Sequence, residues 1–505
     1  MDQIQLNLNT ESLTPHCNTA DLTSTTSIIL KKYSSLEEIQ TLISQKSLRL
    51  SDLLEYYFDQ IEKNEHLNAF NEVFFYSARN QAELVQKKIE EGTAGKLAGM
   101  VIGIKDNMCY KDHQVTASSK MLEGFISPYS STVVKRLLEQ DAIIIGRLNC
   151  DEFAMGGSNE TSYFGPVRNA YDPERVAGGS SGGSAVAVQA DLCLAALGTD
   201  TGGSVRQPAA FCGCIGLKPT YGRISRYGVI AYASSFDQVG VLTSSITDAA
   251  TLLSVLSGSD EHDSTVSRLP VPNYLLEANE QKSRRIAVIK ETIDNDALDS
   301  DLKYAILSAI EKFKEQGHQV DYVSFDLLDY LVPAYYVLTA AEASSNLSRY
   351  DGVHYGHRNL QAENLNELYK KSRSEGFGEE VKRRILLGTF VLSAGYYDAY
   401  YQKAQKVRRL IREKLEDLLS SYDVLLTPVA PTPPFKLGEN IKDPLVMYMA
   451  DIYTVLASLA GIPAIAIPLG NNTEGLPLSL QLMANHFEES TLLSVSKKFL
   501  DLPVH

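Results

Sequence analysis

The chain has 505 residues, with 47 Lys or Arg against 62 Asp or Glu, so its formal net charge is −15 with histidine neutral. This balance argues against a protein whose main surface holds nucleic acid, because such a surface needs positive charge. The content of 44% hydrophobic residues, 33 Gly and 18 Pro is that of a globular protein with a large core, and it excludes a coiled coil, a collagen and a wholly disordered chain.

The first thirty residues are rich in Asn, Thr and Ser, and they lack the basic start and apolar run of a signal peptide. They also lack hydrophobic periodicity, so we expect residues 1–32 to form an N-terminal tail that is flexible or bound to a partner. No segment approaches the roughly 18 apolar residues of a membrane span, because Gly461 and Pro463 interrupt the longest candidate. The sequence predicts a cytoplasmic protein without a membrane partner.

Two amphipathic helices are predicted at the start of the folded region. The first begins at the capping box Ser35-Leu-Glu-Glu38. The second begins at Ser51-Asp52, and its apolar residues repeat at helical spacing: Leu53, Leu54, Tyr57, Phe58 and Ile61. Further along, the pattern predicts a helix over residues 133–138 and a buried strand over residues 142–145.

A strand–helix–strand unit follows in the second half of the chain. It comprises a strand at 286–289, a helix at about 299–316 that ends before Gly317, and a strand at 320–323. Such a βαβ unit pairs its strands in parallel, in a sheet covered on both faces, and we therefore predict an α/β fold.

The last part of the chain continues the same alternation of elements. A charged amphipathic helix at 407–419 leads into a strand-like segment at 423–426 and a proline-rich loop at 428–434. No linker or repeat marks a domain boundary. We expect one large compact domain over residues 33–505.

Cysteine and histidine usage gives no sign of disulfides or a metal. The six cysteines are too sparse for a disulfide framework, and we expect reduced thiols, most of them buried: Cys17, Cys109, Cys150, Cys193, Cys212 and Cys214. His354 and His357 have a spacing that could hold a metal, but no Glu-containing zinc motif accompanies them. No metal site is predicted.

Two clusters of glycine and serine stand out, Gly178-Gly-Ser-Ser-Gly-Gly-Ser184 and the segment 198–208. Glycines at this density let backbone N–H groups face one point, which suits a phosphate site or an oxyanion hole. Neither cluster has the Lys of a phosphate-binding loop or a Gly-x-Gly-x-x-Gly pattern. Their apolar flanks also argue against flexible linkers.

A serine nucleophile in either cluster needs a base, because a free hydroxyl attacks poorly. None of the nine histidines lies inside the clusters. Lys105 closes the apolar run 101–104, so it should lie at a strand end, where burial favours the neutral amine. On the residues alone, an ordinary ion-paired lysine is an equally good interpretation.

Three motifs, in this order and at this spacing, resemble the amidase signature family: Gly103-Ile-Lys105-Asp, the first glycine–serine cluster, and Gly202-Gly-Ser204-Val-Arg-Gln-Pro208. The resemblance extends over about residues 33–500. It implies the fold of that family, with a large mixed central β-sheet covered by helices on both faces. Ala177, Gly157 and Val241 depart from the family pattern, but none of them replaces a reacting group.

The resemblance also implies a catalytic set of Ser, cis-Ser and Lys. Ser204 would attack the amide, and Ser180 would relay the proton to Lys105. Main-chain N–H groups around three residues would hold the oxyanion: Thr201, Gly202 and Gly203. No metal or organic cofactor is implied in this chain.

Within the family, the likeness is to glutaminase subunits of tRNA-dependent amidotransferases. It implies hydrolysis of glutamine to glutamate and ammonia through an acyl-enzyme on Ser204. A partner subunit would use the ammonia and ATP to convert Glu-tRNA(Gln) to Gln-tRNA(Gln). Subunits B and C would complete a heterotrimer, with ATP, Mg and most of the tRNA contacts in the partner.

Substrate binding is implied at three positions. Tyr335 would contact glutamine, Arg384 its α-carboxylate and Asp451 its α-ammonium. By periodicity alone, Arg384 belongs to a solvated helix face, because the charges near it alternate in sign: Lys370, Lys371, Arg373, Glu379 and Glu380.

Two alternatives remain on the sequence. A free-standing amidase for another small amide could use the same Ser–Ser–Lys set, although an apolar amide needs neither Arg384 nor Asp451. A non-catalytic assembly subunit would need none of the reacting groups.

Overall fold

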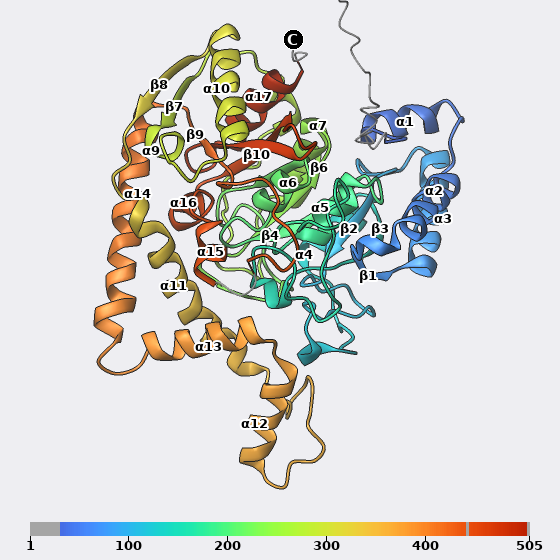
Figure 1. Cartoon of the computed structure of the whole chain (residues 1–505). Helices are drawn as coiled ribbons and strands as arrows, with labels where there is room; N and C mark the ends of the chain where they lie inside the picture. The colour runs from blue at the N-terminus through green and yellow to red at the C-terminus, as the bar shows by residue number, and fades with distance from the viewer. Residues whose placement is uncertain (1–30, 441–443, 502–505) are drawn as a thin grey trace, which may run out of the picture.

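A single 11-stranded sheet runs through the structure, a computed structural model that describes residues 31–440 and 444–501 (Figure 1). The expected tail lies outside the described residues except for Lys31 and Lys32, and so does Cys17. The strands are β1 (Phe70–Val73), β2 (Val101–Lys105), β3 (Ile143–Leu148), β4 (Ala195–Asp200), β5 (Ile215–Lys218), β6 (Gln238–Thr243), β7 (Arg285–Ile289), β8 (Gln319–Val323), β9 (Val424–Pro428), β10 (Ala464–Asn471) and β11 (Pro477–Met483).

The sheet is mixed, in the order β1-β3-β2-β4-β6-β5-β10-β11-β9-β7-β8. Strand β2 pairs in parallel with β3 and β4, and β7 pairs in parallel with β8 and β9. The pairs between β4 and β9 are antiparallel. Strands β2 to β6 are buried along their whole length, as a sheet covered on both faces requires. The predicted α/β fold with a large mixed sheet is confirmed.

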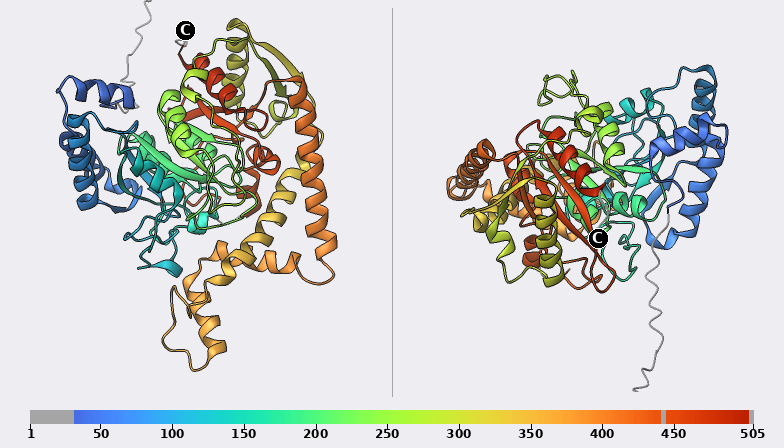
Figure 2. Two further views of the ribbon diagram at one scale, coloured as in Figure 1. Left: turned by 180° about the vertical axis from the view of Figure 1, so that it is seen from behind. Right: turned by 90° about the horizontal axis from the view of Figure 1, so that it is seen from above.

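Helices pack on both faces of this sheet (Figures 1 and 2). Helix α5 contacts β2, β3 and β4, whereas α6 contacts β5, β10 and β11. The helices are α1 (Leu36–Ser44), α2 (Leu50–Lys63), α3 (Phe75–Glu91), α4 (Thr132–Glu139), α5 (Gly182–Gln189), α6 (Arg206–Phe211), α7 (Ile246–Leu256), α8 (Tyr274–Glu277), α9 (Lys290–Ile293), α10 (Ser300–Glu315), α11 (Leu331–Asn346), α12 (Leu365–Gly376), α13 (Glu379–Val391), α14 (Lys403–Ser421), α15 (Pro444–Met449), α16 (Val455–Ala460) and α17 (Glu489–Leu500).

The two predicted opening helices are α1 and α2. Ser35 caps α1, and its hydroxyl accepts a 3.3 Å hydrogen bond from the Glu38 N–H. Helix α2 begins at Leu50, with Arg49 as its N-cap, so the predicted start at Ser51-Asp52 is too late. Leu50 joins the helix because its side chain is buried on the same face as Leu53, and its N–H donates to Gln86 Oε1 across 3.1 Å.

The predicted βαβ unit is β7-α10-β8. Asp299 caps α10 by accepting from the N–H groups of Asp301 and Leu302 at 3.0 Å each. Gly317 follows the helix with φ +85°, a backbone conformation that favours glycine. Strands β7 and β8 then pair in parallel, as predicted.

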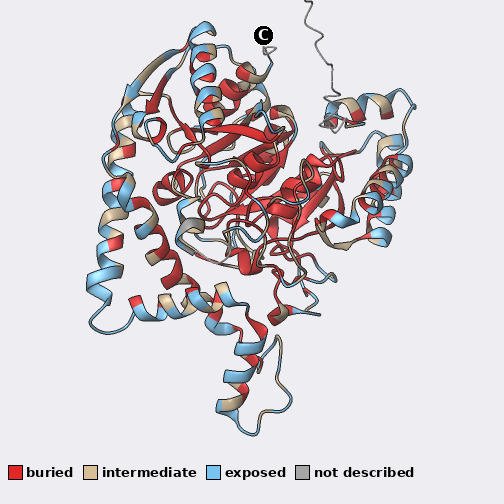
Figure 3. Cartoon of the chain, viewed as in Figure 1, coloured by how far each residue is buried: buried red, intermediate tan, exposed pale blue. Residues whose placement is uncertain are grey.

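Helices α11 to α14 form an arm beside the sheet, and α12 projects from the body of the protein (Figure 1). Helix α13 packs against α11. Much of α12, α13 and α14 is exposed, in contrast to the buried sheet (Figure 3). The buried sides of α11 and α13 carry two of the predicted substrate residues, Tyr335 and Arg384.

Candidate active site

Lys105 is the last residue of β2 and is fully buried. Its Nζ donates hydrogen bonds to Ser180 Oγ at 2.7 Å and to Ser181 Oγ at 2.9 Å. Burial lowers the pKa of the Lys105 ammonium to about 8, against the opposing effect of nearby acidic groups. The structure therefore places the predicted base against the predicted relay serine.

The first glycine–serine cluster forms the turn that enters α5, and the peptide bond between Gly179 and Ser180 is cis. A Cβ atom at Gly179 would lie 2.1 Å from Asp151 Oδ2, so only glycine fits there. The Asp151 N–H donates to the Ser180 carbonyl across 3.1 Å. These contacts fix the backbone on both sides of the cis bond.

The second cluster follows β4 and carries Ser204 just before α6, with 8% of its surface exposed. The Ser181 N–H donates to the Ser204 carbonyl across 3.2 Å, which brings the two clusters together. Among the described residues, the Ser204 hydroxyl has no hydrogen-bond partner, so it is open to a substrate or to Ser180.

Asp200 shapes this second loop. Its buried carboxylate accepts from the Gly203 N–H at 2.9 Å and the Val205 N–H at 3.2 Å, and it forms a bidentate pair with Arg206. The Gly203 N–H is therefore engaged inside the loop, which differs from its expected role as an oxyanion donor. Of the three predicted oxyanion donors, Thr201 and Gly202 remain.

Tyr335 covers the loop at Gly202, one of the predicted oxyanion donors. A Cβ atom at Gly202 would lie 2.4 Å from Tyr335 Oη, so the ring and the glycine are in direct contact. The ring is buried and meets Phe236 edge to face, with centroids 5.8 Å apart. The structure therefore brings the predicted substrate residue Tyr335 against Gly202.

Arg384 is 4% exposed, so the interpretation of this residue as part of a solvated helix face is wrong. Its Nε donates to Glu380 Oε1 at 2.8 Å and its Nη1 donates to Tyr232 Oη at 2.7 Å. The guanidinium also lies over the Tyr232, Tyr336 and Tyr448 rings, 5.1 to 5.6 Å from their centroids. Three aromatic rings from distant segments enclose one charge.

Asp451 lies on the other side of Tyr336, whose hydroxyl donates to Asp451 Oδ2 at 2.8 Å. Burial raises the pKa of the Asp451 carboxyl to about 7, although the Tyr336 hydroxyl and the Arg384 charge act in the opposite direction. Asp451 is therefore ionised at pH values above about 7, where it can pair with a cation.

A cavity of about 230 Å³ opens beside these groups. Its wall includes Arg384, Tyr336 and Gly157. Gln207 connects this wall to both serine loops, because its Nε2 donates to the Gly157 carbonyl at 2.8 Å and its Oε1 accepts from the Gly179 N–H at 2.9 Å. Lys105, Ser180 and Ser204 do not line this cavity, and Gln207 is the link between its wall and the two loops.

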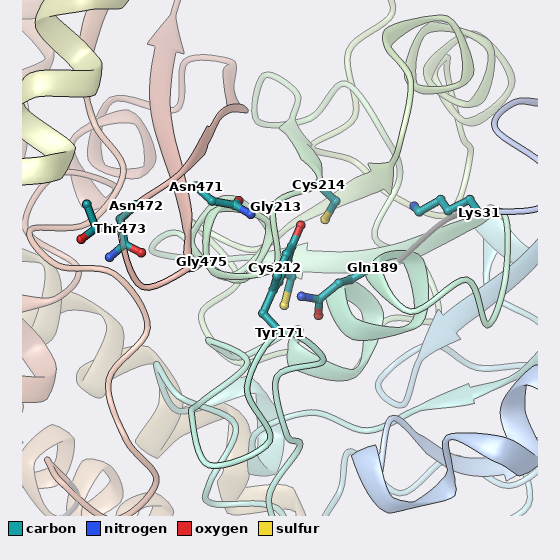
Figure 4. Close-up of a pocket in the computed structure, with 10 residues that line it drawn as sticks. All are labelled: Lys31, Tyr171, Gln189, Cys212, Gly213, Cys214, Asn471, Asn472, Thr473 and Gly475. Carbon is teal, nitrogen blue, oxygen red and sulfur yellow. The ribbon is translucent and has the colours of Figure 1, made fainter. Parts of the chain in front are cut away.

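A larger cavity, of about 430 Å³, lies at the other end of α6 (Figure 4). Ser204 precedes that helix, whereas Cys212 and Cys214 follow it and line the cavity with Tyr171 and Lys31. None of the predicted catalytic residues contributes to its wall.

Three further observations on the described residues concern the cysteines, the possible metal ligands and the possible membrane-spanning helices. The five cysteines there are free and buried, as expected. His354 and His357 pair with Asp351 and Glu375, and no group of three His, Cys, Asp or Glu residues is placed to hold a metal ion in the described part of the chain. No helix of the described residues has both the length and the apolar surface that crossing a bilayer requires.

Several residues of the site were not identified from the sequence. Ser181, Gln207 and Asp200 stand in or beside the glycine–serine motifs, so their proximity to the site was visible, although their roles were not. Tyr336 and Tyr232 gave no local signal, because their importance depends on contacts with distant segments.

The comparisons with known proteins agree with this geometry. A sequence model of the Amidase family matches residues 52–493. The chain is 47% identical over 469 residues to the A subunit of the glutamyl-tRNA(Gln) amidotransferase of Prosthecochloris aestuarii, covering 92% of this chain and 98% of that protein. It is 49% identical over 465 residues to the protein of the same name from Clostridium botulinum, covering 92% and 96%.

A solved structure extends the comparison to the fold. The crystal structure of the glutamyl-tRNA(Gln) amidotransferase A subunit from Thermotoga maritima matches with a TM-score of 0.73 at 39% identity, covering 89% of this chain and 94% of that chain. Sequence and fold agree over most of the length, and the chain belongs to the Amidase family.

Proposed function

We propose that the chain is the glutaminase component, the A subunit, of a glutamyl-tRNA(Gln) amidotransferase. One observation carries the proposal: Gln207 links the loops of the Lys105–Ser180 pair and Ser204 to the wall of a cavity flanked by two opposite charges, Arg384 and Asp451. The first group suits amide hydrolysis, and the charges suit the α-carboxylate and α-ammonium of free glutamine. Relatives nearly half identical over most of the chain carry this name.

Ser204 Oγ attacks the side-chain amide carbon of glutamine, and its proton passes through Ser180 to the neutral amine of Lys105. The N–H groups of Thr201 and Gly202 stabilise the oxyanion. Protonated Lys105 returns the proton through Ser180 to the amide nitrogen, and ammonia leaves. Water then attacks the glutamyl ester, which releases glutamate and regenerates the Ser204 hydroxyl.

Substrate choice follows from the cavity beside this machinery. Two of the donor groups of Arg384 are held by Glu380 and Tyr232, which leaves Nη2 for the α-carboxylate of the substrate. Asp451 accepts the α-ammonium, and Tyr335 fixes the side chain near Gly202. An apolar amide would offer no partner to Arg384 Nη2 or to the second carboxylate oxygen of Asp451, so these polar atoms would lose water without gaining a hydrogen bond.

The ammonia passes to a partner subunit, which uses ATP and Mg to amidate Glu-tRNA(Gln). Subunits B and C complete a heterotrimer, and most tRNA contacts belong to the partner. The net charge of −15 supports this division, because a strongly acidic chain is a poor main surface for tRNA.

The test measures ammonia release from glutamine by the assembled complex with Glu-tRNA(Gln) and ATP. The Ser204→Ala variant should lose glutamine-dependent amidation but keep amidation supported by ammonium chloride. Hydrolysis of an unrelated amide without glutamine turnover would favour a free-standing amidase. Unchanged glutamine use by Ser204→Ala would instead favour a non-catalytic assembly role.

A further inference from the structure

We propose that Asp237 is a positioning residue that couples the substrate-carboxylate side of the site to the oxyanion loop. The inference rests on the proposed glutaminase function, which it deepens by assigning a role to a side chain that contacts neither the substrate nor the reacting atoms.

Asp237 immediately precedes β6 and is 5% exposed. Its two carboxylate oxygens face two different parts of the site. Oδ1 accepts from the Thr201 hydroxyl at 2.7 Å, and Oδ2 accepts from the N–H groups of Tyr232 at 2.9 Å and Ala233 at 3.0 Å. Three donors satisfy a carboxylate that would otherwise be expensive to bury.

On one side, the contact leads to the substrate-binding arginine. The Tyr232 backbone is held by Asp237, and its hydroxyl accepts from Arg384 Nη1 at 2.7 Å. The Tyr232 ring also lies 5.5 Å below the guanidinium. The position of Arg384 in the cavity therefore depends on the backbone that Asp237 holds.

On the other side, the contact leads to the oxyanion donors. Thr201 opens the run Thr201-Gly202-Gly203, and a segment with two glycines needs anchors to keep one conformation. Asp200 anchors the far end through the N–H groups of Gly203 and Val205. Asp237 supplies the anchor at Thr201.

This anchor matters because oxyanion donors act only when they point at the charge that develops during reaction. A shift of the Thr201–Gly202 peptide units by a fraction of an ångström would lengthen those hydrogen bonds. The reaction rate should therefore depend on the Thr201 hydroxyl, although that hydroxyl points away to Asp237.

The test uses the full heterotrimeric complex and measures kcat and KM for glutamine. Thr201→Val keeps the shape of the side chain but removes the hydroxyl that donates to Asp237. We expect kcat to fall about 10- to 100-fold, which does not exceed the loss caused by removing one oxyanion donor. KM should be nearly unchanged. Thr201→Ser restores the hydroxyl and should recover most of kcat. Tyr232→Phe should show the opposite split, with a raised KM.

Asp237→Asn tests the coupling itself, because Asn has one acceptor oxygen, which cannot face both the Tyr232 and Ala233 N–H groups and the Thr201 hydroxyl. It should lower kcat and raise KM together, and adding Thr201→Val should cost little more, since both changes break one contact. Asp248→Asn is the matched control. Asp248 is also a buried carboxylate that accepts from a backbone N–H, but it lies on α7 and its partner is the Leu36 N–H.

Wild-type kcat in Thr201→Val, or a Thr201→Ser variant as slow as Thr201→Val, would overturn the inference. So would an Asp248→Asn variant with the same kcat loss as Asp237→Asn. Amidation from ammonium chloride shows that each variant is folded and assembled. Failure of the proposed glutaminase function would give a different result, namely a wild-type complex that releases no ammonia from glutamine. The same comparison of kcat values would then be made with whichever amide the wild type hydrolyses.

Discussion

Tyr336 donates a 2.8 Å hydrogen bond to Asp451. Its ring also lies 5.1 Å from the Arg384 guanidinium and stacks on Tyr448 with centroids 3.9 Å apart. One aromatic side chain thus sets the separation between the positive and the negative group of the site. A free amino acid carries an α-carboxylate and an α-ammonium that could match these two groups, whereas a simple amide carries neither charge.

Tyr336→Phe removes the hydroxyl and keeps the ring under Arg384. A hydrogen bond to a charged group contributes about 1.5–3 kcal/mol, so KM for glutamine should rise at least about 10-fold while kcat changes little. Steady-state kinetics of ammonia release will check this split. A fall in kcat with an unchanged KM would show that Tyr336 does not serve substrate binding.

Arg384→Lys should lower kcat/KM for glutamine by about 10²-fold, because one ammonium cannot reproduce the fixed fork that bonds Glu380 and Tyr232 and also presents Nη2 to the carboxylate. Turnover of an amide without an α-carboxylate should change far less. Arg409→Lys is the matched control, since Arg409 is exposed on α14, away from the cavity wall, and also pairs with a glutamate, Glu413. Equal losses in the two variants would contradict the role of Arg384.

Lys105 should give the reaction its dependence on pH. Burial lowers the pKa of Lys105 to about 8, and the base must be neutral to accept a proton, so kcat at saturating glutamine should rise as the pH approaches 8 and level off above it. Lys105→Arg keeps a positive charge that cannot be titrated and should lose about 10²- to 10⁴-fold in kcat. A pH profile for Ser204 acylation that is flat from pH 6 to 9 would exclude this assignment.

Local pattern was enough for elements whose neighbours in the sequence are also neighbours in space. The unit β7-α10-β8 is of this kind, because the Asp299 cap and the Gly317 stop are both encoded next to the helix. The order of the sheet was not predictable in this way. Strand β9 lies between β11 and β7, and that placement depends on packing between segments that are far apart in the chain.

The residues of the site differ in the same way, because some could be predicted from local sequence and others could not. Lys105, Ser180 and Ser204 lie in dense motifs, and the resemblance placed all three near one another. Arg384 shows the limit of periodicity: its helix is exposed on one side, but residues far away in the sequence bury this one position. Asp237 gave no signal, because its proposed role depends on a contact with Thr201, which lies 36 residues away in the sequence.

The buried pair of Arg206 and Asp200 should dominate the stability of the loop that carries Ser204. Arg206 is fully buried, and besides Asp200 it donates to the Thr454 carbonyl at 2.8 Å and to Gln481. Burial raises the pKa of Asp200, but the Arg206 guanidinium more than offsets this effect, so the pKa lies below its usual value. The pair therefore stabilises the fold above the unfolded-state pKa of about 3.9, and this contribution is lost as the pH falls through the folded-state pKa.

Arg206→Met should lower the free energy of unfolding by about 3–5 kcal/mol, because it leaves a buried carboxylate without a partner. Urea unfolding at pH 7 will measure the loss, and the deficit should shrink as the pH falls toward 4, because the buried Asp200 carboxyl without its partner takes up a proton at a higher pH in the folded variant than in the folded wild type. Arg79→Met is the matched control: its pair with Glu55 is half exposed, so its removal should change stability little. A deficit that is the same at pH 7 and pH 4 would mean that lost packing, and not the unpaired charge of Asp200, destabilises the variant.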